Sequence, residues 1–267
     1  MRIGCHTITW GGVYGSGVGV TSVKDAFYVT AGDTEQALRE IAEIGYEGVE
    51  LFDGDLLQFP GDLGRLLEST GLELIATYVG GSYIYRDTLE EELWRVAQAA
   101  PAAAALGAEH LVVGGGARRW DRAPNDGDYD ALAYALDRVA SLAADHGLTA
   151  GYHPHLTTMA ETPEEIAKVF DRTSIGFCPD TAHLAAAGGD IRELVARYRD
   201  RVQYVHLKDL TRKPFAFEPL GRGELDLHGL LDDLRSSGFA GWVTTELDSY
   251  DGPAAEAARE SYSFVSG

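Results

Sequence analysis

The sequence predicts an α/β fold, a single (β/α)8 TIM barrel over residues 1–267. Short apolar segments alternate eight times with longer amphipathic ones, which is typical of a parallel sheet whose strands are joined by helices. Eight such pairs need roughly 250 residues to close into a barrel, and this chain is long enough. Polar side chains also gather where the expected strands end, the edge at which barrel enzymes carry their active sites.

The expected elements follow one another in strand–helix order. The strands are 2–8, 47–52, 72–79, 109–115, 148–153, 174–180, 202–209 and 241–247. The helices are 33–45, 62–70, 88–107, 129–147, one opening at 162–165, one opening at 190–193, then 227–238 and 254–265.

Capping residues indicate where several of these helices begin and end. Asp33 stands three residues before Gln36, and Thr162 stands three before Glu165, so both are predicted N-caps. Gly45 is expected to end the first helix. In segment 88–107, Thr88 and Glu91 predict a capping box, and Pro101 predicts a kink.

Residues 11–32 are predicted to form a long loop over the mouth of the barrel. The alternative fold is an open, doubly wound sheet, which usually carries a glycine-rich phosphate turn after its first strand. Gly15, Gly17 and Gly19 lie in this segment, but they do not directly open a helix. The segment therefore fails the structural context that a dinucleotide-binding fingerprint requires.

The charge of the chain narrows the classes of partner. Lysine and arginine total 22 against 42 aspartate and glutamate residues, a formal net charge of −20. Such a chain repels nucleic acids and anionic membranes, so neither is an expected partner. No apolar run reaches membrane-spanning length, and the first residues lack a signal-peptide layout. Cys5 and Cys178 are expected to be buried, reduced thiols, and the protein is expected to be cytoplasmic.

Metal-competent side chains gather at the carboxyl ends of the expected strands. Of the eight histidines, five lie there: His6, His153, His155, His183 and His206. The same ends carry Glu50, Asp180, Lys208, Glu246 and Asp248. A buried cluster of carboxylates and imidazoles is costly unless a cation neutralises it. Mixed oxygen and nitrogen ligands predict one divalent metal ion: Mn²⁺, Co²⁺, Zn²⁺ or Mg²⁺.

Structural roles are the competing interpretation of these residues. A single histidine or glutamate at a strand end usually makes only an ordinary hydrogen bond. Five strands that supply such groups to one rim favour a functional site instead. For Lys208 the structural alternative is a salt bridge with Asp209 or another carboxylate.

Several motifs resemble the sugar isomerase/epimerase superfamily of xylose-isomerase-like barrels, and more closely its inosose dehydratase branch. These motifs are GCHTITW (4–10), YHPHLTT (152–158), CPDTAHLAAAGGD (178–190), YVHLKD (204–209) and GFAGWVTTELD (238–248). The likeness covers most of the chain and is densest over 145–250.

The resemblance implies roles for individual residues. Asp180, His206 and Glu246 match three of the four metal ligands, and the fourth comes from the strand ending near residue 153. His153 is the first choice for it, and His155 is the alternative. The remaining implied roles are catalysis by Glu246, His183, Lys208 and Glu50, and substrate binding by His6, His155 and Trp10.

The resemblance also implies the reaction. It is metal-dependent removal of an α proton from a keto-sugar or keto-inositol through an enediolate, most simply followed by dehydration of an inosose. Isomerisation or epimerisation is the alternative, because Pro154, Leu156 and Thr157 depart from the branch where the substrate lies. An endonuclease-IV-like DNA repair barrel and a sugar-binding barrel without turnover are more remote alternatives. The expected partner is a small polyol or keto-sugar, and homo-oligomerisation stays open.

Overall fold

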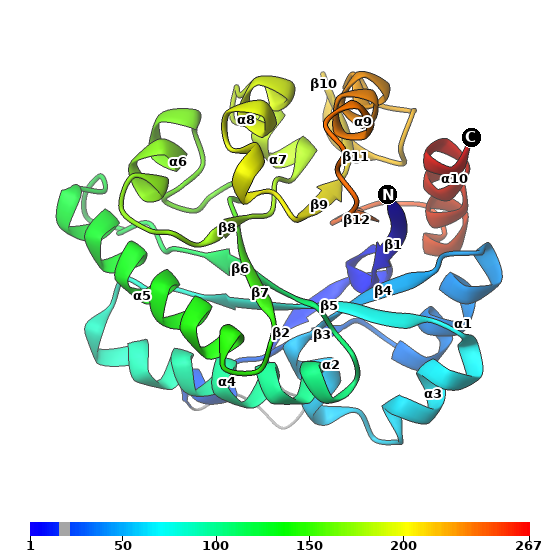
Figure 1. Cartoon of the computed structure of the whole chain (residues 1–267), viewed down its shortest axis with the longest axis horizontal. Helices are drawn as coiled ribbons and strands as arrows, with labels where there is room; N and C mark the ends of the chain where they lie inside the picture. The colour runs from blue at the N-terminus through cyan, green and yellow to red at the C-terminus, as the bar shows by residue number, and fades with distance from the viewer. Residues whose placement is uncertain (16–21) are drawn as a thin grey trace.

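Eight parallel strands form a barrel in the computed structural model, which describes residues 1–15 and 22–267 (Figure 1). The barrel strands are β1 (Arg2–His6), β4 (Gly48–Phe52), β5 (Glu73–Gly81), β6 (His110–Gly115), β7 (Thr149–His153), β8 (Gly176–Phe177), β9 (Tyr204–Leu207) and β12 (Trp242–Thr245). They pair in the order β8-β7-β6-β5-β4-β1-β12-β9. Isolated parallel bridges join Phe177 to Val202 and Asp180 to His206, so the ends of the sheet meet. The predicted TIM barrel is confirmed.

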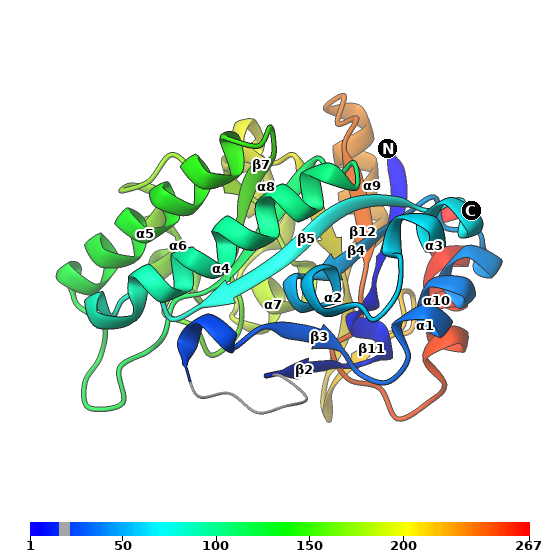
Figure 2. The same ribbon diagram turned by 90° about the horizontal axis from the view of Figure 1, so that it is seen from below.

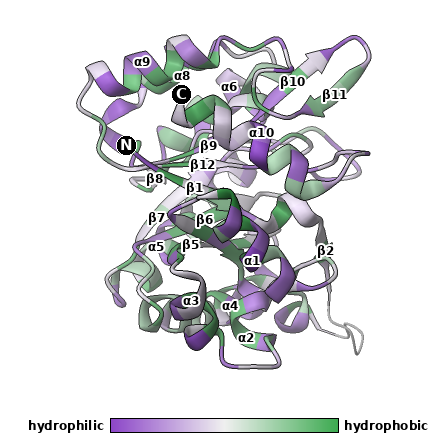
Figure 3. Ribbon diagram, turned by 90° about the vertical axis from the view of Figure 1, so that its right-hand side faces the viewer, coloured by the Kyte–Doolittle hydropathy of each residue, from purple (hydrophilic) through white to green (hydrophobic). Residues whose placement is uncertain are grey.

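Helices surround the strands. They are α1 (Thr34–Ile44), α3 (Leu63–Thr70), α4 (Arg86–Ala105), α5 (Asp126–Ala144), α6 (Pro163–Phe170), α8 (Ile191–Arg197), α9 (Leu227–Ser236) and α10 (Ala254–Ser266). Shorter helical segments are α2 (Asp53–Gln58), α7 (Thr181–Ala186), η1 (Thr7–Trp10), η2 (Val23–Asp25) and η3 (Arg199–Arg201). Hydrophobic residues gather on the central strands, and hydrophilic residues are frequent on the surrounding helices (Figure 3). None of the described helices has the length and hydropathy needed to cross a membrane.

The predicted caps at two helices are confirmed. The side chain of Asp33 accepts a hydrogen bond from the Gln36 amide at 3.1 Å, and that of Thr162 accepts one from the Glu165 amide at 3.3 Å. Gly45 ends α1 with a φ of 113°, a left-handed conformation that glycine adopts without strain. Local side-chain chemistry therefore sets these boundaries.

The predicted capping box of the helix over 88–107 was wrong. Helix α4 begins at Arg86, two residues early, and Tyr85 at its N-cap makes no side-chain hydrogen bond to it. Glu91 instead accepts hydrogen bonds from the Ser22 hydroxyl and, at 3.4 Å, from the Lys24 amide. A contact with the distant mouth segment has replaced the local cap, and Pro101 lies inside the helix.

The segment over 11–32 is not simply a loop, which corrects the prediction. Strands β2 (Gly12–Tyr14) and β3 (Tyr28–Thr30) pair antiparallel, and they lie together beside the barrel in Figure 2. Asp53 accepts a hydrogen bond from the Tyr28 amide at 2.9 Å, and Asp55 accepts one from the Thr30 amide at 3.0 Å. Both carboxylates lie in α2, so a contact between distant segments fixes the hairpin. Gly17 and Gly19 lie outside the described residues.

A second hairpin, β10 (Asp209–Arg212) with β11 (Phe215–Glu218), follows β9 and was also not predicted. The Asp209 carboxylate organises the loop after it. This carboxylate accepts hydrogen bonds from the amides of Gly221 and Gly223 at 3.0 Å and of Leu225 at 3.2 Å. The Asp209 carboxylate therefore stabilises the loop that follows the hairpin and is not the ion-pair partner of Lys208.

Asp53 makes the stability of the hairpin anchor depend on pH. Burial raises the pKa of Asp53 to about 7, although Arg95 lies 3.8 Å from its carboxylate. The pKa of an unfolded aspartate is about 3.9. Because the folded-state pKa is the higher one, the folded protein binds the proton more tightly. The stabilisation is complete below about pH 4 and is lost as the pH rises through about 7.

We expect the free energy of unfolding of the parent protein to fall relative to that of Asp53→Asn between pH 4 and 7. The slope is at most about 1.4 kcal/mol per pH unit. Urea denaturation of both proteins across this range measures it, with exposed Asp121→Asn as the control for a lost charge. A pH-independent difference between the parent and Asp53→Asn would contradict the assignment.

Candidate metal centre

Four predicted ligands converge at the carboxyl ends of the strands. His153 ends β7, Asp180 follows β8 and precedes α7, His206 lies in β9, and Glu246 follows β12. One ligand atom of each lies within 4.8 Å of the others, and all four residues are buried. Segments that are far apart in the sequence thus place two imidazoles and two carboxylates around one point.

Asp180 is held in place by its role as a helix cap. Its Oδ1 accepts a hydrogen bond from the His183 amide at 2.9 Å, which caps the first turn of α7. The neighbouring bridge to His206 fixes its backbone against β9. One carboxylate oxygen is thereby used by the fold, and Oδ2 remains for the centre.

Three buried ligand atoms meet at this point: His153 Nδ1, Asp180 Oδ2 and His206 Nδ1. His153 Nδ1 has no hydrogen-bond partner in the described part of the chain, whereas Asp180 Oδ2 lies 3.0 Å from Lys208 Nζ and His206 Nδ1 lies 3.3 Å from Glu246 Oε2. One unsatisfied buried polar atom costs roughly 1–3 kcal/mol. A bound cation would satisfy His153 Nδ1, and two nitrogen and two oxygen donors suit a borderline divalent ion. The residues therefore fit the predicted metal.

Glu50, predicted to be catalytic, lies behind His206. Its Oε2 lies 2.7 Å from His206 Nε2 and accepts a hydrogen bond from the Tyr204 hydroxyl at 2.8 Å. Thr244 donates to that hydroxyl at 2.6 Å, and His6 Nε2 lies 3.6 Å from Glu50 Oε1. Burial raises the pKa of Glu50, but His206 and His6 outweigh it, so the net pKa is lowered. The fully buried carboxylate is placed to orient His206.

Glu50→Gln is expected to weaken metal binding while preserving the fold. Loss of a carboxylate behind a ligating histidine typically costs 10–100-fold in metal affinity. Tyr204→Phe removes only the hydrogen bond from the Tyr204 hydroxyl to Glu50, so its effect should be smaller. Competition with a fluorescent chelator measures both dissociation constants. Parent-like affinity of a folded Glu50→Gln protein would contradict this role.

Lys208 is fully buried beside the same cluster. Its Nζ lies 2.8 Å from Asp248 Oδ1, 2.6 Å from Glu246 Oε1 and 3.0 Å from Asp180 Oδ2. It also lies 3.1 Å from His183 Nε2. Burial lowers the pKa of Lys208, but these carboxylates outweigh it and raise the pKa further above its usual value. The salt bridge considered for this lysine exists, but with these acids and not with Asp209.

His155, His183 and Asp248 form the outer part of the site. The rings of His155 and His183 have centroids 3.7 Å apart, and His183 Nε2 lies 3.1 Å from Asp248 Oδ2. The side chains of His155 and Asp248 are 35% and 23% exposed. They are therefore more accessible than the buried ligands. Burial lowers the pKa of His155 to about 4, with the charge of His183 acting in the same direction.

An aromatic wall faces these polar groups. His6 packs its ring against Phe52 at 4.7 Å, and Tyr28 of the mouth hairpin lies 5.4 Å from Tyr78. Tyr78 in turn lies 6.1 Å from the ring of His153. The sequence alone did not indicate a site role for Tyr28, Phe52 and Tyr78, because aromatic residues at strand ends are also common in a hydrophobic core. Burial lowers the pKa of His6 to about 4.

The side chain of Trp10, which is predicted to bind substrate, makes a hydrogen bond to an outer helix. Its indole Nε1 donates a hydrogen bond to Glu40 of α1 at 2.6 Å. The short helix η1 begins immediately after β1 and carries Trp10 toward this outer helix.

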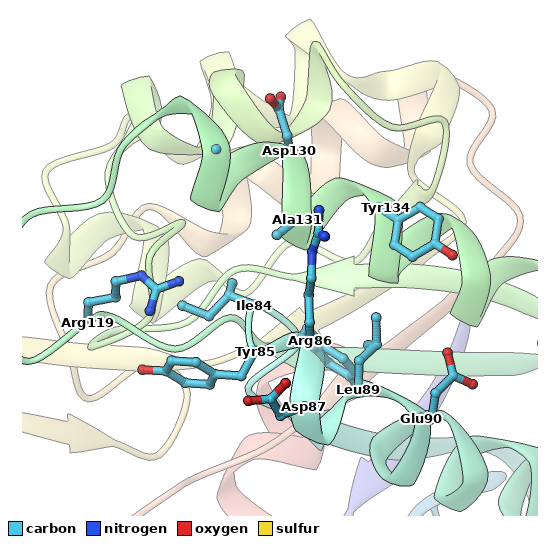
Figure 4. A pocket seen from close by; sticks show the side chains of 12 residues that line it. Ile84, Tyr85, Arg86, Asp87, Leu89, Glu90, Arg119, Asp130, Ala131 and Tyr134 are labelled. Carbon is cyan, nitrogen blue, oxygen red and sulfur yellow. The ribbon is translucent and has the colours of Figure 1, made fainter.

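A separate groove of about 970 Å³ opens between the first turns of α4 and the adjoining part of α5. Figure 4 shows Arg119 and Tyr85 at one end of it and Tyr134 and Glu90 at the other. Its described lining residues include no member of the metal cluster. The groove is thus distinct from the candidate site.

Known proteins resemble the chain over most of its length. The profile of the xylose isomerase-like TIM barrel family matches residues 38–266. An inosose dehydratase of Geobacillus kaustophilus (strain HTA426) is 33% identical, with 85% of this chain and 74% of that protein covered. A rhizopine catabolism protein of Rhizobium meliloti is 27% identical, with 93% and 82% covered.

Solved structures share the fold. The 3-keto-D-glucoside 4-epimerase of E. coli aligns with a TM-score of 0.75 at 19% identity, covering 100% of this chain and 99% of that one. A D-allulose 3-epimerase from Methylomonas sp., in complex with D-allulose, aligns with a TM-score of 0.77 at 18% identity, covering 100% and 96%.

Fold and site together define a (β/α)8 barrel with a buried cluster of two histidines and two carboxylates at its mouth, able to hold a metal ion. The chain belongs to the xylose isomerase-like TIM barrel family.

Proposed function

We propose that the protein is a divalent-metal-dependent enzyme that removes the α proton of a keto-sugar or keto-inositol, and that it dehydrates an inosose-like substrate. The observation that carries this proposal is the meeting of two imidazoles and two carboxylates at one buried point, where His153 Nδ1 has no hydrogen-bond partner within the described residues. The relatives named inosose dehydratases support the choice of dehydration. His153, Asp180, His206 and Glu246 are the proposed ligands.

A divalent ion held by these residues would polarise the substrate carbonyl and so acidify the neighbouring C–H bond. Glu246 is the proposed base. Its Oε1 lies 2.6 Å from Lys208 Nζ and its Oε2 lies 3.3 Å from His206 Nδ1, so contacts on two sides fix this carboxylate beside the proposed centre. The aromatic wall of Phe52, Tyr28 and Tyr78 offers an apolar surface to the ring carbons of the substrate.

Dehydration also needs a proton for the departing β-hydroxyl. His183 is the proposed donor, because its Nε2 lies 3.1 Å from Asp248 Oδ2 and Asp248 reaches the exposed part of the site. Glu246 gains the α proton, His183 gives a proton to the hydroxyl, and water leaves. Proton exchange through Asp248 and solvent can then restore both groups.

Epimerisation or isomerisation is the second candidate. It shares the first step, and His155 and Asp248 provide further polar groups at the rim that could return a proton to another position. The segment around Pro154 differs from the dehydratase pattern where it would contact the substrate. Turnover of DNA is disfavoured by the net charge of −20.

Product analysis separates these candidates. The metal-loaded protein is incubated in D₂O with a panel of inososes and ketoses, and the products are followed by mass and ultraviolet absorbance. Loss of one water with a new enone or dione absorbance supports dehydration. Incorporation of α deuterium without loss of water supports epimerisation or isomerisation. No change in any substrate would contradict the proposed function.

A further inference from the structure

The Lys208 ammonium occupies a pocket built like a second metal site. Its Nζ lies within 3.1 Å of four potential ligand atoms, contributed by Asp180, His183, Glu246 and Asp248. Three of these residues, His183, Glu246 and Asp248, place ligand atoms within 4.8 Å of one another and could hold an ion by themselves. Lys208 is fully buried.

The charges at the two neighbouring positions balance with one metal ion. Asp180, Glu246 and Asp248 carry three negative charges when ionised. One divalent ion in the proposed centre and one ammonium supply three positive charges. Glu50 is occupied separately by His206 and Tyr204. A second divalent ion beside Lys208 would add unneutralised charge in a buried site, where such charge is costly.

The position is closed on its outer side. The Lys208 Nζ lies 5.1 Å from the ring centroid of Phe217 in the β10–β11 hairpin, within the range of a cation–π contact. The ring of His183 lies 5.4 Å from the same phenyl ring. The hairpin thus covers a cation position and holds its histidine in place.

We propose that the Lys208 ammonium takes the place of a second metal ion, so that the native site binds one divalent ion. Replacing the ammonium by a neutral group opens a second site formed by His183, Glu246 and Asp248. In the native protein Lys208 is a positioning residue. It donates a hydrogen bond to Asp248 and lies 3.1 Å from His183 Nε2, and its charge holds Glu246 and Asp180 in register. This inference rests on the proposed metal centre.

Metal stoichiometry tests the inference with Mn²⁺ as the probe. The parent protein, Lys208→Ala and Lys208→Arg are dialysed against Mn²⁺, and bound metal is counted per chain. We expect one ion in the parent, two in Lys208→Ala and one in Lys208→Arg, which keeps the positive charge. The Lys208→Ala, Asp248→Asn double variant should return to one ion, since Asp248 belongs only to the second position.

Electron paramagnetic resonance provides a readout that does not depend on activity. Two Mn²⁺ ions sharing the Glu246 carboxylate should give a spin-coupled spectrum in Lys208→Ala, whereas the parent should give the spectrum of isolated ions. Lys208→Gln has the same expected outcome and serves if the alanine protein does not fold. One ion in either folded neutral variant, or two in the parent, would overturn the inference. No ion in the parent would instead contradict the proposed function.

Discussion

Asp180→Asn and Glu246→Gln proteins are expected to fold and to lose the stoichiometric metal ion that the parent protein retains. Asparagine at position 180 can still accept the hydrogen bond from the His183 amide, so the cap of α7 should survive. The variant loses the negative charge at Oδ2, a buried atom 3.0 Å from the Lys208 ammonium. The variant therefore separates the metal-binding role of Asp180 from its structural one.

Glu246→Gln should have the larger effect on turnover, because it removes a ligand and the proposed base together. Loss of a general base alone typically lowers the rate 10²–10⁴-fold. Metal analysis after dialysis measures the loss of the ion, and kcat/KM with the inosose substrate measures the loss of turnover. Asp190→Asn is a matched control, since Asp190 caps α8 through the Glu193 amide at 3.0 Å and lies outside the site. Full metal content in both site variants would refute the ligand assignment.

His153→Ala and His155→Ala are expected to fail in different ways. His153 is buried, and its Nδ1 lacks a hydrogen-bond partner within the described chain, as expected of a metal ligand. His155 is partly exposed, and its Nδ1 lies 2.7 Å from the carbonyl oxygen of Leu156. We therefore expect His153→Ala to lose more metal affinity than the 10–100-fold typical of an outer-shell change.

His155→Ala should keep its metal and bind substrate more weakly. Loss of one hydrogen bond of about 1.4 kcal/mol corresponds to roughly tenfold in KM. Chelator competition gives the metal affinities, and steady-state kinetics on metal-saturated protein give KM. If His155→Ala loses the ion while His153→Ala retains it, the two histidines have the reverse roles.

The barrel was predictable because the sequence patterns that define its strands and helices are local. Each strand–helix pair carries its own alternation of apolar and polar residues, and caps such as Asp33 and Thr162 lie within three residues of their partners. The β2–β3 hairpin was missed because its position depends on distant groups. Asp53 and Asp55 bind the β3 backbone from a helix more than twenty residues further along the chain, and no local sequence pattern predicts such contacts.

The metal cluster was predictable from the common direction of the strands. Parallel strands end at one rim, so residues at their carboxyl ends must meet there. The depth of each side chain in the barrel was not predictable. Glu50 pairs in register with His6 across β4 and β1, and its carboxylate lies 2.7 Å from His206 Nε2. A strand pattern gives the face of a residue but not its height relative to its neighbours.

The central claim is metal-dependent removal of an α proton, and solvent deuterium exchange tests it most directly. Chelator-stripped protein and the same protein reloaded with Mn²⁺ are incubated in D₂O with an inosose, and α deuterium is measured in the recovered substrate and product by NMR and mass spectrometry. We expect exchange or turnover with the reloaded protein, and neither with the stripped protein or with Glu246→Gln. Equal exchange in all three samples, or none with the reloaded protein, would contradict it.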